Sequence, residues 1–162
     1  MDAVHIRLVE VALLVVHVLG GGVWIGAMVF SIFILHPRAE TFFARAVDFE
    51  HFIFHVVHGA RWKVAAGIAA IAASGVGLSR WPGHSVLDDG GYRALVAAKL
   101  LCFCVSAGSF SYVSWVLWPR RAFATASELP ALKARFWRIG VVMIVANAAN
   151  MTLGIAAHVW RA

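Results

Sequence analysis

Charged residues are scarce in this sequence: they make up 14% of its 162 residues, whereas roughly 25% is usual in soluble domains. Only three residues are lysine, and only eight are acidic. Hydrophobic residues reach 62%, and the mean hydropathy is +0.82. A soluble protein of this size cannot bury so much apolar surface in one core. The composition therefore excludes a soluble or disordered chain and predicts an integral membrane protein.

Cysteine is also rare, which excludes a disulfide-stabilised scaffold. Cys102 and Cys104 are the only two cysteines, and at positions i and i+2 of a helix they point to different faces. We therefore expect two free thiols. The sequence also lacks a nucleotide-binding loop, a Ser-His-Asp set and paired catalytic carboxylates, so it leaves open whether the protein is an enzyme.

Four long apolar stretches are present, and each exceeds the ~20 residues that a helix needs to cross ~30 Å of hydrocarbon. They cover residues of about 4–36, 50–79, 92–118 and 136–160. The connections between them are short, as in an antiparallel bundle. We therefore predict an all-α integral membrane protein, in which residues 1–162 form a single up-down bundle of four transmembrane helices. No internal repeat is evident in the sequence.

The distribution of Lys and Arg predicts the orientation, because cytoplasmic loops carry the excess of these residues. The side that holds the first and third connections has Arg38, Arg45, Arg120, Arg121, Lys133, Arg135 and Arg138, and the opposite side has Arg7, Arg80, Arg93 and Arg161. We expect a multi-pass protein of the inner (cytoplasmic) membrane with both termini outside, in the periplasm. The residues responsible for the net charge of +6 then lie mainly in loops. The positive charge is thus explained by topology, and no nucleic-acid partner is expected. Four tryptophans at span ends suggest an aromatic belt: Trp81, Trp118, Trp137 and Trp160.

Three basic groups fall at a similar depth inside the spans, where ionisable residues are costly and usually functional. At a rise of ~1.5 Å per residue, His17 and Lys99 lie roughly 9 Å from their span centres toward the outer side. His158 lies roughly 12 Å toward the same side. Antiparallel folding therefore predicts one outer layer that contains groups from three helices.

A glycine accompanies each of the two histidines in this layer. Gly21 follows His17 by one helical turn, and Gly154 precedes His158 by one turn. A glycine beside a histidine leaves a hollow in which a porphyrin can lie with its iron on the imidazole. The alternative is close packing between helices, for which small residues are typical.

The residues of the outer layer support a haem b site. His17 and His158 are the candidate axial ligands. Trp24 is a candidate wall of the haem pocket, and Lys99 is a candidate anchor for a haem propionate or an anionic substrate. Lys99 can instead be a lysine that extends to the outer interface.

A second histidine cluster is predicted near the cytoplasmic side. His51, His55 and His58 follow positions i, i+4 and i+7 and share one helix face, and His36 ends the first span on the same side. Two histidines at i and i+4 can chelate a metal ion. The cluster is therefore a candidate metal site, a candidate second haem site with His36, or a wet face near the headgroups.

Several of these motifs resemble two related families of membrane proteins. The segment His17-Val-Leu-Gly-Gly-Gly-Val-Trp24-Ile-Gly26 resembles the first helix of the copper resistance protein D (CopD) family. The segments Ala73–Leu78, Tyr92–Leu101 and Pro119-Arg120 are similar to later helices of that family. The pairing of His17 with Lys99, together with Arg135-Phe-Trp-Arg138, resembles the HemJ family of four-helix protoporphyrinogen oxidases. The resemblance implies functional roles for His17 and Lys99.

Three functions follow from these observations. The first is a membrane-embedded b-type haem-binding redox protein that transfers electrons to or from a quinone, oxygen or a redox partner protein, within a larger complex or a homo-oligomer in the lipid bilayer. The second is a CopD-like protein of copper transport or resistance, with a copper ion on His17, Met28, Met151 and His158 or on the histidines of the second span. The third is a HemJ-like protoporphyrinogen oxidase. A structural subunit without a cofactor is the remaining alternative, and the haem b protein is our preferred prediction.

Overall fold

The computed structural model describes residues 3–79 and 90–159, except the side chains of Ala3 and His158. Every regular element in these residues is helical: α1 (Ala3–Phe30), η1 (Ser31–Leu35), α2 (His36–Phe42), α3 (Ala46–Ser79), α4 (Gly90–Tyr112), η3 (Val113–Leu117), α5 (Trp118–Ala122) and α6 (Leu129–Val159). Four continuous helical segments are long and apolar enough to cross a membrane: Val4–Phe42, Ala46–Ser79, Gly90–Ala122 and Leu129–Ala157. The prediction of an all-helical chain with four such helices is confirmed.

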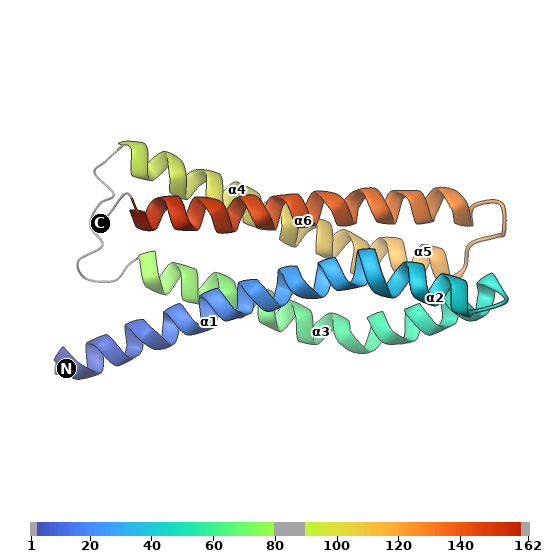
Figure 1. The fold of residues 1–162 in the computed structure, drawn as a ribbon, viewed down its shortest axis with the longest axis horizontal. Helices are drawn as coiled ribbons and strands as arrows, with labels where there is room; N and C mark the ends of the chain where they lie inside the picture. Colours follow the sequence, from blue (N-terminus) through green and yellow to red (C-terminus); the bar gives the residue numbers. More distant parts are fainter. Residues whose placement is uncertain (1–2, 80–89, 160–162) are drawn as a thin grey trace.

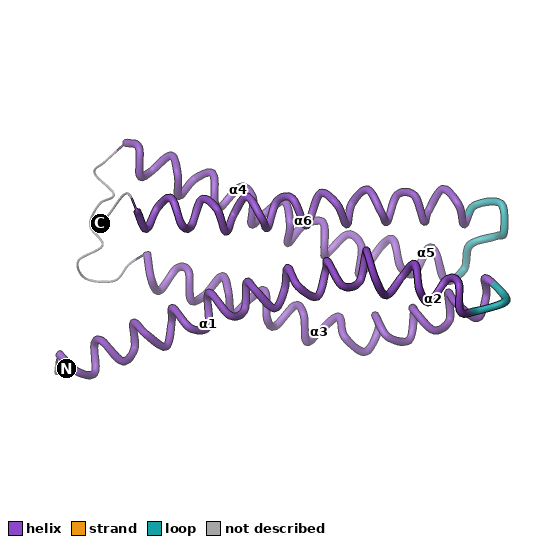
Figure 2. The backbone as a smooth tube through the Cα atoms, in the orientation of Figure 1, coloured by secondary structure: helices purple, strands orange, loops and turns teal. Residues whose placement is uncertain are grey.

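The helices form two antiparallel hairpins that lie side by side. α1 packs mainly on α3, and α4 packs mainly on α6, while contacts between α1 and α6 join the hairpins. Figure 1 shows α1 and α4 beginning at one end of the bundle, here called the terminal end. The short connections 43–45 and 123–128 lie together at the opposite end, here called the basic end (Figure 2).

Proline determines a local widening of two helices. Pro37 and Pro119 follow the π-helical turns η1 and η3, in which His36 N–H bonds to Ser31 O and Trp118 N–H bonds to Val113 O. A proline in a helix lacks its N–H, and its ring collides with the carbonyl four residues earlier. That carbonyl belongs to Phe33 or Trp115, inside each π-helical turn. The wider turn lets the helix continue through the proline, so the first segment extends to Phe42 rather than ending near residue 36.

The two hairpins repeat the same design, although the sequence showed no repeat. Each consists of a long helix, a π-helical turn, a short helix that begins with X-Pro-Arg, and a long returning helix. The π-helical turns start at residues 31 and 113 and end at residues 35 and 117, an offset of 82 in both cases. The same offset relates Pro37 to Pro119. The structure therefore shows a repeated order of elements that was not evident as a repeat in the sequence.

The best-packed apolar core lies toward the basic end. Its buried residues are Ala39, Phe49, Ile53, Val113, Leu117 and Trp118. Trp118 is only 3% exposed, so its expected place in an aromatic belt is wrong, whereas Trp137 is exposed. Trp81 and Trp160 lie outside the described residues. Cys102 and Cys104 are free, as expected.

Candidate functional site

His17 is held on the neighbouring helix through one ring nitrogen. Its Nδ1 lies 3.0 Å from the carbonyl oxygen of Ile71 and 3.2 Å from the hydroxyl of Ser74, both on α3. The Ser74 hydroxyl also donates to the Ile71 carbonyl at 3.0 Å. Because a carbonyl only accepts hydrogen bonds, Nδ1 must carry the hydrogen when it bonds to Ile71. The lone pair of the neutral ring is then on Nε2.

A glycine on α3 makes room for this imidazole. A Cβ atom on Gly75 would lie 2.9 Å from Cε1 of His17. Real Cβ atoms essentially never come so close, so even alanine would displace the ring. Gly75 therefore determines how closely His17 approaches α3. No sequence motif links these two residues, which belong to different helices.

Lys99 has a corresponding contact in the other hairpin. Its Nζ lies 3.1 Å from the position that a Cβ on Gly154 would take, so the ammonium covers this glycine. Lys99 is partly buried, and it is close enough to His17 for an electrostatic interaction. None of the ion pairs between described residues includes Lys99. His17 and Lys99 are thus close enough to interact electrostatically, although His17 packs on α3 and Lys99 on α6.

The other members of the predicted layer differ in their surroundings. His158 lies on α6 one turn beyond Gly154, but its side chain is outside the described residues. Gly21 has no atom within 4 Å of an added Cβ, so the space beside it is open. Trp24 is 6% exposed and packs edge-on against Phe103 of α4, with 6.2 Å between ring centroids. Its indole N–H is buried without a hydrogen-bond partner.

The hydrogen bond of His17 is of the kind that metal-ligating histidines make. A histidine that ligates a metal usually donates its second ring N–H to a carbonyl or carboxylate, which fixes the ring and its tautomer. The Ile71 carbonyl provides this partner, and Nε2 is left for a metal. The open space at Gly21 and the unpaired N–H of Trp24 are further features that a bound group can use.

The histidines of the second span lie apart from this layer. His51, His55 and His58 are exposed along one face of α3, and His58 Nδ1 contacts the guanidinium of Arg61. In the part of the chain that the structure describes, no group of three or more His, Cys, Asp or Glu side chains is arranged to hold a metal ion. The proposed metal role of these three histidines remains a prediction.

His36 is instead part of an aromatic cluster at the basic end. Its ring centroid lies 4.6 Å from that of Phe136, 5.6 Å from that of Trp118 and 6.0 Å from that of Phe49. The imidazole is therefore packed between α3, α5 and α6.

A buried ion pair that was not predicted from the sequence lies beside this cluster. Arg121 is 2% exposed, and its Nη2 and Nε donate to the Glu50 carboxylate at 2.6 and 3.1 Å. Its guanidinium also covers the Trp118 ring, 4.3 Å from the centroid. Lys133 extends the network, with Nζ 2.6 Å from Glu40 and 3.7 Å from Glu50. The only signal in the sequence was an acidic residue at the start of a predicted span.

Comparisons with models of protein families, with curated proteins and with solved structures gave no match.

Proposed function

We propose that this chain is a membrane-embedded protein that binds haem b and transfers electrons, with His17 as an axial ligand. It works in the lipid bilayer of the cytoplasmic membrane, with the basic end in the cytoplasm. Its electron partners are a quinone, oxygen or a redox protein, within a larger complex or a homo-oligomer. The resemblance to the CopD and HemJ families is compatible with this proposal through His17 and Lys99.

The hydrogen bond between His17 Nδ1 and the Ile71 carbonyl carries the proposal. A neutral imidazole in an apolar span needs a partner for its N–H, because an unpaired polar group costs several kcal/mol there. The bond to Ile71 satisfies Nδ1 and fixes the ring, but it leaves the basic Nε2 free. A histidine with a purely structural role would need only this bond. A ligand to iron needs this bond and a free Nε2, which is the arrangement of His17.

The neighbouring residues have separate roles in the proposed site. His158 is the candidate second ligand, since α6 places it one turn from Gly154 and near the depth of Lys99. The Lys99 ammonium, which has no carboxylate partner among the described residues, is available to a haem propionate. Trp24 closes the site toward the bundle centre. The haem itself would supply the one-electron chemistry, while the chain orients it and limits access of water.

An absorption spectrum of the purified full-length protein, with haem counted per chain, tests the proposal. We expect a Soret band, sharp α and β bands after reduction, and one haem per chain. The variants His17→Ala and His158→Ala should each abolish or grossly alter low-spin binding, whereas Lys99→Ala should retain ligation. An unchanged bis-histidine spectrum in His17→Ala would show that the ligand pair is wrong.

The second-span histidines provide a matched control. Replacing His51, His55 and His58 together with Asn should leave the haem count unchanged, because all three are exposed on α3. Loss of a haem in this variant would show that a haem-binding site lies near the basic end. A colourless protein that retains copper would instead support the CopD-like function, and oxidation of protoporphyrinogen by the protein would support the HemJ-like one.

A further inference from the structure

A groove runs between α5 and α6 at the basic end, away from the outer layer that contains His17. Its cavity volume is about 670 Å³, and it is lined by Pro119, Arg120, Phe123, Ala124, Glu128, Ala131 and Leu132. A second cavity of about 550 Å³ shares Ala131 and Leu132 and adds Arg135, Arg138 and Ile139. The two adjacent cavities share Ala131 and Leu132, and together, as one groove beside α6, they are lined by apolar residues and three arginines.

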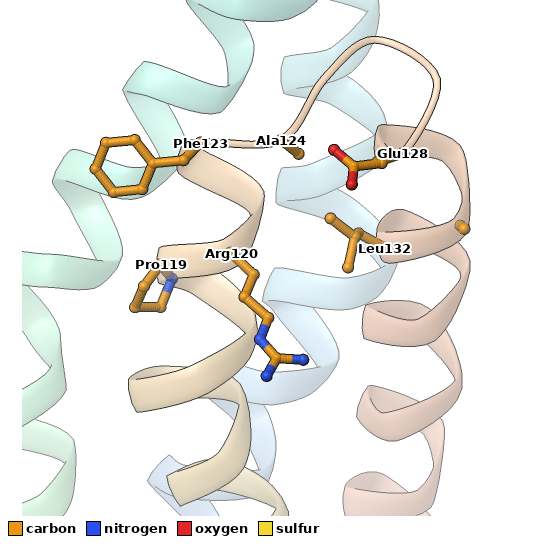
Figure 3. A pocket seen from close by; sticks show the side chains of 7 residues that line it. Pro119, Arg120, Phe123, Ala124, Glu128 and Leu132 are labelled. Atoms are coloured by element: carbon orange, nitrogen blue, oxygen red, sulfur yellow. The ribbon is translucent and has the colours of Figure 1, made fainter.

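The arginines come from two helices: Arg120 of α5 lines the first cavity, and Arg135 and Arg138 of α6 line the second. Figure 3 shows the side chains of Arg120 of α5 and Leu132 of α6 in the space between the two helices. Arg135 and Arg138 are three residues apart and lie on the same face of α6. All three side chains are exposed, although the Arg135 guanidinium lies 5.1 Å from the Tyr112 ring centroid and Arg138 Nε donates to Ala134 O at 3.3 Å.

Nearby acidic groups do not neutralise the three arginines. No ion pair within the described ranges 3–79 and 90–159 includes Arg120, Arg135 or Arg138. Glu128 also lines the groove, but its carboxylate accepts hydrogen bonds from the Thr125 backbone N–H at 2.9 Å and from the Thr125 hydroxyl at 2.7 Å. These bonds lower the pKa of the Glu128 carboxyl. The carboxylate thus caps the start of α6, and the groove keeps an excess of positive charge.

We propose that this groove binds the phosphate headgroup of an anionic phospholipid through Arg120, Arg135 and Arg138. The groove lies where two apolar spans end, which is the depth of lipid phosphates when the bundle crosses a bilayer. Guanidinium groups match phosphate oxygens in geometry and charge. Basic pockets between membrane helices bind anionic headgroups in this way. Leu132, Ile139 and Pro119 provide apolar surface for the first part of the acyl chains.

Native mass spectrometry of the full-length protein in detergent tests the site. The protein is titrated with dioleoyl phosphatidylglycerol or with dioleoyl phosphatidylcholine, and the lipid retained per chain is counted. We expect the anionic lipid to bind at least about tenfold more tightly. Each Arg→Gln substitution at the three positions should weaken its binding about fivefold, because a basic residue near lipid phosphates contributes ~1 kcal/mol. Raising the salt concentration should reduce the preference.

The internal repeat provides the matched control. Arg38 follows Pro37 as Arg120 follows Pro119, and it is also exposed at the basic end, but it does not line the groove. Arg38→Gln should therefore retain the preference for the anionic lipid. Equal binding of the two lipids would overturn the proposal, as would an equal loss in Arg38→Gln. Full displacement of lipid by millimolar glycerol phosphate would also overturn it, because the site would then bind free phosphate.

Discussion

His17 and Lys99 occupy equivalent positions in the two hairpins. They are 82 residues apart, the same offset that relates the π-helical turns and the two prolines. Each also lies on a glycine of its partner helix, His17 on Gly75 and Lys99 on Gly154. Repetition of one hairpin therefore places both basic groups at equivalent positions, His17 on α1 and Lys99 on α4. A site between two such repeats can combine an imidazole ligand from one with a cation from the other.

Gly75→Ala should disturb the proposed haem site without removing any ligand. The added Cβ would lie 2.9 Å from Cε1 of His17 and push the ring away from the Ile71 carbonyl. We expect a lower haem occupancy and a loss of stability of about 1–3 kcal/mol from overpacking. The absorption spectrum and the thermal unfolding midpoint measure these effects.

Gly67→Ala on the same helix is the control for this substitution. An added Cβ at Gly67 meets no atom within 4 Å, and alanine is the better helix former. If Gly75→Ala and Gly67→Ala give the same haem content, the packing of His17 on α3 has no part in the site.

Gly154→Leu and Gly21→Leu should both weaken haem binding, for different reasons. Leucine at Gly154 displaces the Lys99 ammonium, which lies 3.1 Å from the Cβ position, whereas leucine at Gly21 fills open space. Adding Lys99→Ala should therefore relieve the Gly154→Leu defect in part and leave the Gly21→Leu defect unchanged. Haem counted per chain distinguishes the two, and equal relief in both double variants would contradict this explanation.

Glu50→Gln should strongly destabilise the bundle, because it leaves the Arg121 guanidinium buried without its counter-charge. Breaking one side of a buried ion pair costs about 3–5 kcal/mol. The double variant with Arg121→Gln should lose less than the sum of the two single variants, since no unpaired charge remains. Unfolding by denaturant in detergent measures all three.

An exposed pair serves as the comparison. Arg45 and Asp48 bond at 2.7 and 2.9 Å, but both side chains are exposed. Asp48→Asn should change stability little, because exposed ion pairs contribute little. A loss as large as that of Glu50→Gln would show that burial is not the cause.

The orientation of the bundle is tested with fused reporters. A reporter after Ala162 should lie outside, and one in the segment between Arg120 and Lys133 should lie in the cytoplasm. The basis is the excess of Lys and Arg at the basic end. The opposite result would reverse the proposed orientation and place the His17 layer near the cytoplasmic surface.

Local features of the sequence determined the four apolar helices. Hydropathy is a property of consecutive residues, so a run of apolar side chains predicts a span whatever it packs against. The same applies to the basic residues of the first and third connections, and to His17 and Lys99 as polar groups inside apolar runs. The approximate span limits followed as well, apart from the extension of the first helix through Pro37.

Only the tertiary structure decided which side chains meet. The bond of His17 to Ile71 and the ion pair of Arg121 with Glu50 join residues 54 and 71 positions apart, and no local pattern specifies such pairs. Packing also turned Trp118 into the core rather than toward the membrane interface. The repeated hairpin was hidden because equivalent positions hold different side chains, such as His17 and Lys99, while the backbone responds to the same proline in both. Side-chain contacts between helices depend on how the hairpins pack. That packing depends on interactions throughout the bundle, not on any one segment.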